Sequence, residues 1–425
     1  MPAVLCFGAI ADDLTGAVEL AGMLVAGGVR TALVTGPEAI PDDAQAVVIA
    51  LRSRVAPAEV AVAAFARAAA ALHARGAAQL FFKYCATFDS TPRGNIGPCA
   101  DVLATLRDGP VLFCPTFPEA DRTVYRGHLF VGDTLVSRSP KRDDPLTPMT
   151  EPDLVQVLQA QTARRVGLLR HGVVAAGAAA ISRHVLDLLG QGTRFVIADA
   201  VAEDDLRAIA AASWHWPVMT GGASVAAHYS RLWHADGLIA PAAREPAPAI
   251  AGPTAVLVGS CAGRTRAQLA CFADRHPVLP LDLHAIDDAQ AAVAAALAWA
   301  VPRLADGPVG ITTAAAPEAV AAVQRKLGVT GGAVLAERLL AGIAHGLVAH
   351  GVRRLLVAGG ETSGAVVQAL GITRLHVAPY RAAGIGLCRA EAPVALALCL
   401  KSGKLGPVDM FAAALADLGA PTPAA

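Results

Sequence analysis

The chain has 425 residues, of which 54% are hydrophobic and only 16% charged, so it can form two domains with large apolar cores. Lysine plus arginine equals aspartate plus glutamate at 35 each, and aromatic residues make up only 4%. Zero net charge with so few aromatic side chains argues against nucleic acid as a partner, because such partners are bound by basic surfaces and stacking platforms.

Short apolar runs alternate with helical patterns through the first 240 residues. Strands are predicted at 4–10, 31–34, 46–51, 80–82, 111–114, 166–169, 194–198 and 218–219. Helices are predicted at 14–26, 57–75, 98–106, 177–189, 203–213 and 223–229. This alternation indicates βαβ units and a parallel sheet. The stretch 123–137 alternates around Gly132-Asp133 and predicts a β-hairpin excursion, and the proline-rich stretch 138–152 predicts a loop.

A second α/β domain is predicted after a proline-rich linker. Residues 241–253 hold four prolines without periodicity, which divides the chain into a domain at 1–240 and another at 254–425. In the second domain, strands are predicted at 255–258, 278–283, 307–312, 355–357 and 394–400, and helices at 265–274, 289–304, 333–350 and 365–370. The predicted fold class is therefore α/β, with a mainly parallel sheet flanked by helices in each domain.

Two adjacent aspartates, Asp12 and Asp13, stand between the first strand and the first helix. An aspartate at such a turn commonly caps the helix, which accounts for one of the two. The second carboxylate suggests chemistry, since a carboxylate can accept the proton of a substrate hydroxyl. Both residues are therefore candidate catalytic groups, and the sequence leaves open which of them is the base.

Polar side chains also follow the third and fourth predicted strands. The candidate ligand-binding residues are Arg52, Ser53, Lys83, Asp89, Ser90 and Arg93. The carboxyl ends of parallel strands meet at one edge of a sheet, so these side chains are expected to form one polar face. Arginine and lysine suit a carboxylate, and the remaining side chains suit hydroxyl groups. We expect a small polyhydroxylated acid there, the alternative being charges that are merely solvated.

A glycine-rich turn in the second domain predicts a phosphate site. The candidate ATP-binding residues are Ser260, Gly359, Gly360, Glu361, Thr362, Ser363 and Gly403. Glycines permit close approach of the backbone, and the following helix offers free N–H groups to a phosphate. The alternative is a tight turn with a hydroxyl residue as N-cap. Together the two domains suggest phosphoryl transfer in a cleft, with ATP and Mg²⁺ as cofactors and the metal ligands unknown.

Several segments of the sequence resemble the four-carbon acid sugar kinase family. They are 10–17, 82–98, 127–132, 145–150 and 359–364. The resemblance implies ATP-dependent phosphorylation of the 4-hydroxyl of 3-oxo-tetronate (3-dehydro-erythronate) in the catabolism of four-carbon acid sugars. It also implies that the N-terminal domain binds the sugar acid and that Ser260, the 360–363 turn and Gly403 bind ATP. A D- or L-threonate 4-kinase of the same family is the alternative.

Functions of other classes fit the sequence less well. A nucleotide-dependent oxidoreductase would carry GxGxxG after the first strand, where this chain has Asp12-Asp13. A non-catalytic sugar-acid binding protein would carry an export signal, and no basic stretch precedes an uninterrupted apolar run here.

We expect a cytoplasmic protein without a membrane segment, whose eight scattered cysteines are free thiols. The expected partners are the sugar acid and ATP, and a homodimer is among the assemblies left open.

Overall fold

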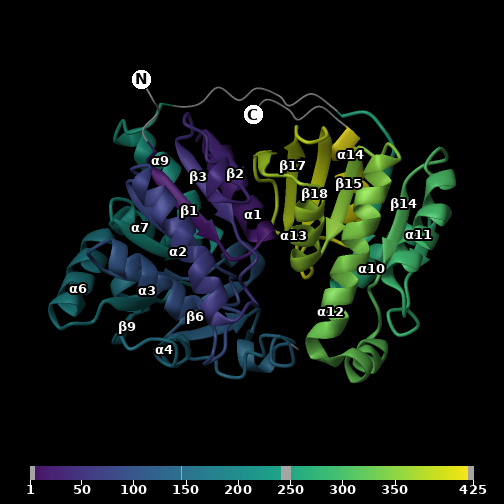
Figure 1. The fold of residues 1–425 in the computed structure, drawn as a ribbon. Helices are drawn as coiled ribbons and strands as arrows, with labels where there is room; N and C mark the ends of the chain where they lie inside the picture. The colour runs from purple at the N-terminus through teal and green to yellow at the C-terminus, as the bar shows by residue number, and fades with distance from the viewer. Residues whose placement is uncertain (1–4, 145, 241–249, 420–425) are drawn as a thin grey trace. The chain divides into compact units, whose positions relative to one another are not determined.

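The computed structural model describes residues 5–144, 146–240 and 250–419. The chain divides into two compact units, residues 1–243 and 244–425, which run from purple to teal and from green to yellow in Figure 1. Each unit has a mainly parallel sheet with helices on both of its faces, which confirms the predicted α/β fold class. Most of the predicted linker, 241–249, lies outside the described residues, so the linker and the domain boundaries stay predictions.

The first unit contains one parallel sheet. Its strands are β1 (Phe7–Ala11), β2 (Thr31–Val34), β3 (Ala46–Ala50), β4 (Gln79–Lys83), β5 (Val111–Cys114), β9 (Val166–Leu169), β10 (Phe195–Ala198) and β11 (Val218–Gly221). They lie in the order β2-β3-β1-β4-β11-β5-β10-β9. Because β3 and β4 flank β1 and all three strands are parallel, the residues that follow them meet at one edge of the sheet. At this edge the order of the strands reverses, since the chain adds β2 and β3 on one side of β1 and β4 on the other. Ligands of α/β sheets bind at such points.

Helices cover both faces of this sheet. They are α1 (Leu14–Ala26), α2 (Ala58–Ala74), α3 (Ile96–Leu106), α4 (Leu154–Gln159), α5 (His171–Val174), α6 (Ala178–Gly190), α7 (Glu203–Ser213), α8 (Ala223–Ala227) and α9 (Tyr229–Ala235). Helices α2, α3 and α4 pack side by side on one face, and α1, α8, α7 and α6 on the other. The last predicted helix, 223–229, corresponds to α8, whereas α9 and the short α5 were not predicted.

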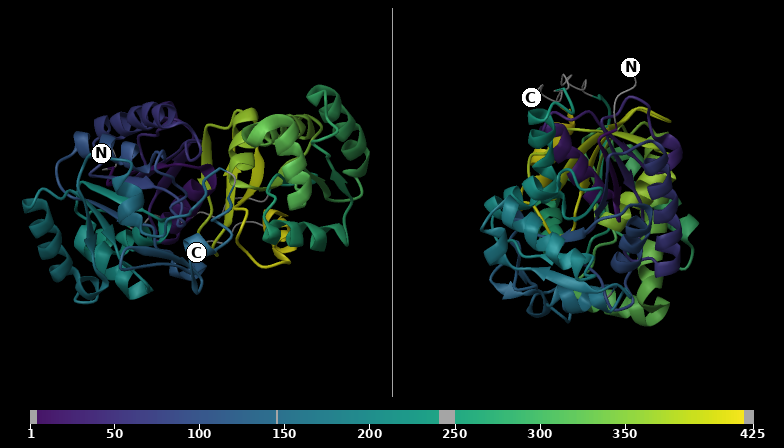
Figure 2. Two further views of the ribbon diagram at one scale, coloured as in Figure 1. Left: turned by 90° about the horizontal axis from the view of Figure 1, so that it is seen from below. Right: turned by 90° about the vertical axis from the view of Figure 1, so that its left-hand side faces the viewer.

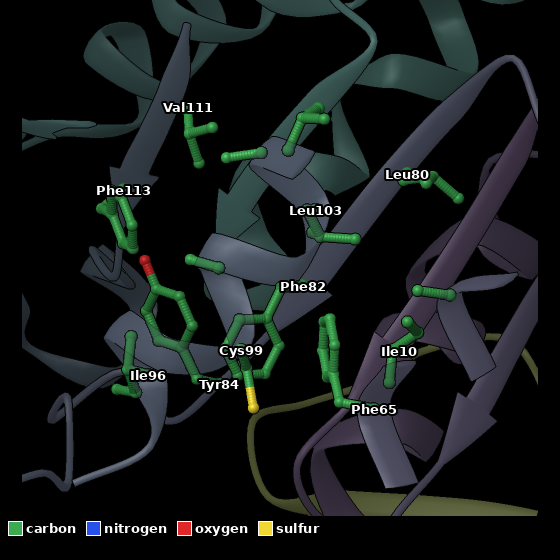
Figure 3. Packing of buried hydrophobic residues seen from close by; sticks show 14 of the residues in the cluster. Ile10, Phe65, Leu80, Phe82, Tyr84, Ile96, Cys99, Leu103, Val111 and Phe113 are labelled. Carbon is green, nitrogen blue, oxygen red and sulfur yellow. The ribbon is translucent and has the colours of Figure 1, made fainter. Parts of the chain in front are cut away.

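Aromatic residues fill the core under α2 and α3 (Figure 3). The ring of Phe82 packs edge-on against Phe65, with centroids 4.7 Å apart, and against Tyr84 at 5.3 Å. Tyr84 in turn packs edge-on against Phe88 at 5.3 Å. These contacts anchor the beginning of the loop after β4 in the hydrophobic core, so the polar residues that follow are held on a rigid base.

The hairpin excursion is confirmed and carries a third strand. Strands β6 (Arg122–Tyr125), β7 (His128–Val131) and β8 (Thr134–Leu135) form an antiparallel sheet. Buried Asp199, which follows β10, fixes the β6–β7 turn by accepting hydrogen bonds of 2.8 Å from the N–H groups of Arg126 and Gly127. Short 3₁₀ turns lie at Pro37–Ala39, Pro118–Ala120 and Val136–Arg138.

The second unit has a mixed sheet. Its strands are β12 (Thr254–Val258), β13 (Val278–Pro280), β14 (Val309–Thr312), β15 (Arg354–Ala358), β16 (Arg374–Val377), β17 (Ile385–Ala390) and β18 (Leu396–Lys401). They lie in the order β13-β14-β12-β15-β18-β17-β16, and β17 is antiparallel to both of its neighbours. The sequence did not predict β16 and β17, because the buried face of β17 holds only Gly386, Cys388 and Ala390, which give a weak alternating signal.

The helices of the second unit differ from the predicted ones at three places. They are α10 (Gly263–Ala273), α11 (Ala289–Ala300), α12 (Pro317–Ala349), α13 (Gly360–Ala369) and α14 (Met410–Gly419), with a 3₁₀ turn at Val301–Arg303. Helix α12 begins well before the predicted residue 333 and is interrupted at Gly328, whose φ is 80°. Helix α13 begins at Gly360, although its glycines weaken helix propensity. Helix α14 was not predicted.

One part of α12 is long and apolar enough to cross a membrane by length and composition alone. The stretch Thr330–Ala349 has 20 residues and a mean hydropathy of 1.4. In this structure it packs against α11 and α13, and 39% of it is buried within the protein. A core helix of a compact α/β unit meets the same criteria of length and hydropathy.

Candidate active site

Asp12 and Asp13 lie at the carboxyl end of β1, and both are 4% exposed. Asp13 is the N-cap of α1: its carboxylate accepts hydrogen bonds from the N–H of Gly16 at 2.7 Å and from the hydroxyl of Thr15 at 3.0 Å. The capping role anticipated for one of the two aspartates thus belongs to Asp13. Asp12 is left with a buried carboxylate that no helix requires.

Arg54, which follows β3, joins the two carboxylates. Its Nε and Nη2 donate to the two oxygens of Asp12 at 2.9 and 2.8 Å, and its Nη1 lies 2.8 Å from Oδ2 of Asp13. Burial raises the pKa of Asp12 and the charge of Arg54 opposes that rise, while the two carboxylates hold the pKa of Arg54 well above its ordinary value. The positive charge of the Arg54 guanidinium, which contacts both carboxylates, permits two acidic groups to lie in one buried site.

The ligand-binding candidates included Arg52 but not Arg54, although both follow the third predicted strand. The side chain of Arg52 is exposed, whereas that of Arg54 is 18% exposed and faces the aspartates. The backbone explains the difference, because the N–H groups of Ser53 and Arg54 both donate to the carbonyl of Asp12, at 2.9 and 3.2 Å. The sequence shows two arginines, two residues apart, after the same strand. Which of them faces the site depends on how these backbone hydrogen bonds turn the chain.

Lys83 brings a cation to the same edge. It is the last residue of β4 and 3% exposed, and its Nζ donates to the carbonyl of Tyr84 at 3.0 Å and lies 3.9 Å from a carboxylate oxygen of Glu19. A Cβ at Gly16 would lie 2.7 Å from Oδ1 of Asp13 and 3.0 Å from Nζ of Lys83. Glycine at this position therefore lets the ammonium group lie beside the capping carboxylate.

Asp89 is bound to the loop 138–152. Its Oδ1 lies 2.7 Å from Nζ of buried Lys141 and accepts a hydrogen bond of 2.6 Å from the hydroxyl of Thr87. The same Nζ of Lys141 lies 2.9 Å from a carboxylate oxygen of Asp144. The two carboxylates raise the pKa of Lys141. The sequence prediction missed Lys141, because its irregular surroundings give no periodic signal. Phe88, the residue before Asp89, is buried with a φ of 61°, a strained conformation for a bulky residue that sets the direction of this loop.

The remaining predicted residues differ in burial. Ser53 is buried, and its carbonyl accepts a hydrogen bond of 2.7 Å from the side chain of Asn95, which joins the loops after β3 and β4. The hydroxyl of buried Ser90 accepts one of 2.9 Å from Gln161. The side chain of Arg93 is exposed, like that of Arg52.

In the second unit, the turns after β12, β15 and β18 lie together. Gly359 is the N-cap of α13 with a φ of 129°, and its N–H donates to the carbonyl of Lys401 at 2.9 Å. A Cβ at Gly359 would lie 3.3 Å from the backbone nitrogen of Ser260, and one at Gly403 would collide with the Ser260 hydroxyl. Ser260, Gly359 and Gly403 therefore approach one another as closely as their backbones allow.

The first turn of α13 holds the other four candidates, Gly360 to Ser363. The hydroxyl of Ser363 donates to the carbonyl of Gly359 at 2.7 Å, so Ser363 supports the turn itself. The first N–H groups of an α-helix have no intrahelical acceptors, so this helix N-terminus is a candidate anion-binding position. Among the described residues, the buried hydroxyls of Ser402 and Thr313, at the ends of β18 and β14, have no hydrogen-bond partner.

Comparison with known proteins now places the chain. A sugar-binding N-terminal domain family matches residues 7–229, and a nucleotide-binding C-terminal domain family matches residues 255–411. Curated relatives from Burkholderia multivorans and Cupriavidus necator, both named 3-oxo-tetronate kinase, are each 45% identical over 97% of this chain and 97% of their own. The chain belongs to the four-carbon acid sugar kinase family.

Solved structures agree with this membership. A Salmonella typhimurium LT2 protein, described with its crystal structure as a tRNA synthase, has a TM-score of 0.82 at 34% identity and covers 97% of this chain and 99% of its own. Haemophilus influenzae protein HI1011 has a TM-score of 0.71 at 33% identity, covering 97% and 100%. For a member of the acid sugar kinase family, the carboxyl edge of the first unit belongs to the sugar-binding domain and the Gly359 turn to the nucleotide-binding domain.

Proposed function

We propose that this chain is an ATP-dependent kinase that transfers a phosphoryl group to the 4-hydroxyl of 3-oxo-tetronate. The observation that carries the proposal is the identity of 45%, over 97% of both chains, to relatives named for this activity. The predicted domain at 1–240 binds the sugar acid, and the predicted domain at 254–425 binds ATP. The cytoplasmic location stays a prediction.

Asp12 is the proposed general base. Phosphoryl transfer needs the acceptor hydroxyl to lose its proton, and a buried carboxylate with a raised pKa accepts a proton more readily than a solvated one. Asp13 is less suited, because its carboxylate is the N-cap of α1 and its protonation would weaken the hydrogen bond from the N–H of Gly16. Arg54 keeps Asp12 oriented, and Lys83 supplies positive charge for the carboxylate of the sugar acid.

Mg²⁺ is proposed to arrive with the nucleotide. Among the described residues, no group of three or more histidine, cysteine, aspartate or glutamate side chains could hold a metal ion. Mg²⁺ in kinases is bound mainly by phosphate oxygens and water with one or two carboxylates, so the residues present fit a phosphate-borne ion. Glu361, in the first turn of α13, would supply a carboxylate. The ion would neutralise charge on the transferred phosphoryl group.

A substrate panel tests the function. ADP release would be measured with ATP, Mg²⁺ and each of 3-oxo-tetronate, D-threonate, L-threonate and erythronate, with NMR of the product. We expect the highest kcat/KM with 3-oxo-tetronate and a product phosphorylated at C4. Faster turnover of a threonate would reassign the chain to another activity of the same family, and no ADP release with any acid would remove the proposal.

Gly359→Ala is expected to weaken ADP binding. Its φ of 129° disfavours any side chain, and the added Cβ would lie 3.0 Å from the Thr362 hydroxyl and 3.3 Å from the Ser260 nitrogen. Strain of this kind costs roughly 1–3 kcal/mol. Gly351→Ala is the matched control, because its φ is also positive at 95° but nothing lies near the added atom. Calorimetry should show weaker ADP binding for Gly359→Ala alone; equal affinities would place the nucleotide elsewhere.

Lys141→Met is expected to raise the KM for the sugar acid. The change removes the buried ion pairs that hold Asp89 and Asp144, at 2.7 and 2.9 Å. Losing a hydrogen bond to a charged group corresponds to a roughly 10- to 100-fold change in an equilibrium constant, and we expect a rise in KM of that order. Lys326→Met, which removes the exposed pair with Asp287, is the control and should leave steady-state kinetics unchanged. An unchanged KM in Lys141→Met would exclude Asp89 from the binding of the acid.

A further inference from the structure

Lys401, the last residue of β18, is fully buried at 0% exposure although it carries an ammonium group. Its Nζ donates to the hydroxyl of Thr265 at 2.8 Å and to the carbonyl of Gly403 at 3.3 Å. The Thr265 hydroxyl itself donates to the Gly403 carbonyl at 2.5 Å. The three residues thus join the end of β18, the turn after it and the first turn of α10.

The backbone carbonyl and the side-chain ammonium group of Lys401 each form a hydrogen bond to a turn that is proposed to bind ATP. Its backbone carbonyl accepts the N–H of Gly359, the N-cap of α13, at 2.9 Å. Its ammonium group holds Gly403, whose Cα faces the Ser260 hydroxyl so closely that a side chain would not fit. A shift of Lys401 would therefore move the Gly359 and Gly403 turns together.

Among the residues that the structure describes, no carboxylate forms an ion pair with this ammonium group. The charged and titratable groups that face it are the thiol of Cys399 on its own strand and the guanidinium of Arg264 on α10. Asp417 of α14 acts on Cys399 instead. Burial lowers the pKa of Lys401 to about 7. A buried cation without a counter-charge is costly, so keeping one beside a phosphate-binding turn points to an anion that arrives with the ligand.

We propose that Lys401 is a positioning residue of the nucleotide site, which holds the Gly403 turn and the first turn of α10 in place for the phosphates of a nucleoside di- or triphosphate and gains a proton when they bind. This inference rests on the proposed function, and it adds a positioning role for Lys401 and the uptake of one proton when the nucleotide binds. The bound phosphates supply the missing negative charge, and the protonated ammonium keeps its hydrogen bonds to Thr265 and Gly403. No bond to the nucleotide is required of Lys401 itself.

The first test measures protons on the wild-type protein. Calorimetry of ADP binding with Mg²⁺, one pH unit above the Lys401 pKa of about 7, is repeated in two buffers with different ionisation enthalpies. The difference gives the number of protons exchanged, and we expect uptake close to one per ADP. Normal ADP binding without proton uptake would overturn the role of Lys401 and leave the kinase function standing. No ADP binding at all would overturn both.

The second test uses Lys401→Met and Lys401→Arg. The methionine variant should bind ADP at least about tenfold more weakly, without proton uptake, because the hydrogen bonds to Thr265 and Gly403 are lost. Its ligand-free thermal midpoint, measured one pH unit below the Lys401 pKa of about 7, should not fall, since at that pH the change removes a buried unpaired charge. The arginine variant should recover part of the affinity and, being always charged, take up no proton. A lower midpoint with undiminished ADP affinity would make Lys401 purely structural. If Lys401→Met does not fold, Thr265→Val removes the same hydrogen bond and should weaken ADP binding.

Discussion

Asp12→Asn is expected to lower kcat by roughly 10²–10⁴-fold, the range that a general base contributes, while ADP affinity stays at the wild-type value. The carboxylate of Asp12 is 4% exposed and its pKa is raised by burial, so it is prepared to accept a proton. An amide has no comparable basicity. ADP release by a coupled assay, together with ADP calorimetry, separates a loss of chemistry from a loss of nucleotide binding.

Two matched variants sharpen this expectation. Asp13→Asn keeps an N-cap, since asparagine also caps helices well, and should reduce kcat far less than Asp12→Asn. Asp101→Asn removes a carboxylate that pairs with Arg164 at 2.6 Å elsewhere in the first unit, and should leave kcat unchanged. A larger loss in Asp13→Asn than in Asp12→Asn would reverse the assignment of the base.

The fold, and the grouping of the candidate residues at one edge of the first sheet, were largely predictable from local sequence patterns. Apolar runs such as Val111–Cys114 and Val166–Leu169 matched the observed strands residue for residue, because buried parallel strands are continuously hydrophobic. Polar residues directly after such runs must then meet at one edge of the sheet, which is how Asp12 and Lys83 came to be grouped before their contacts were known.

The pairing of side chains could not be predicted in the same way. Arg54 faces Asp12 because two backbone N–H groups bond the Asp12 carbonyl, and Lys141 reaches Asp89 from a segment without periodicity. Lys401 looked like an ordinary residue at a strand end, and neither its complete burial nor its hydrogen bond to Thr265 of α10 could be predicted from the sequence. The role of each of these cations is set by partners distant in the sequence, which local sequence patterns do not reveal.

Arg54→Met is expected to impair both activity and stability, the second in a pH-dependent way. The change leaves the Asp12 carboxylate buried without the guanidinium that bonds both of its oxygens at 2.8 and 2.9 Å. Breaking a buried ion pair costs roughly 3–5 kcal/mol at a pH where the remaining group stays charged. kcat/KM should fall as well, because the carboxylate loses its fixed orientation toward the acceptor hydroxyl.

The sign of the pH dependence follows from the pKa of Asp12, which burial raises already in the wild type and which rises further without Arg54. A carboxyl group whose folded-state pKa lies above its unfolded value of about 4 contributes stability that is fully present below that value and is lost as the pH rises through the folded pKa. Urea unfolding should therefore show a small deficit for Arg54→Met in mild acid and a larger one in mild base. The double variant Arg54→Met/Asp12→Asn removes both charges of this pair, while Asp13 keeps its cap hydrogen bonds, so it should recover part of the stability in base. Arg164→Met, which removes the half-buried pair with Asp101, should show a smaller change that differs little between the two pH values. An equal deficit for Arg54→Met at both pH values would mean that Arg54 stabilises the fold by packing rather than by holding the charge of Asp12.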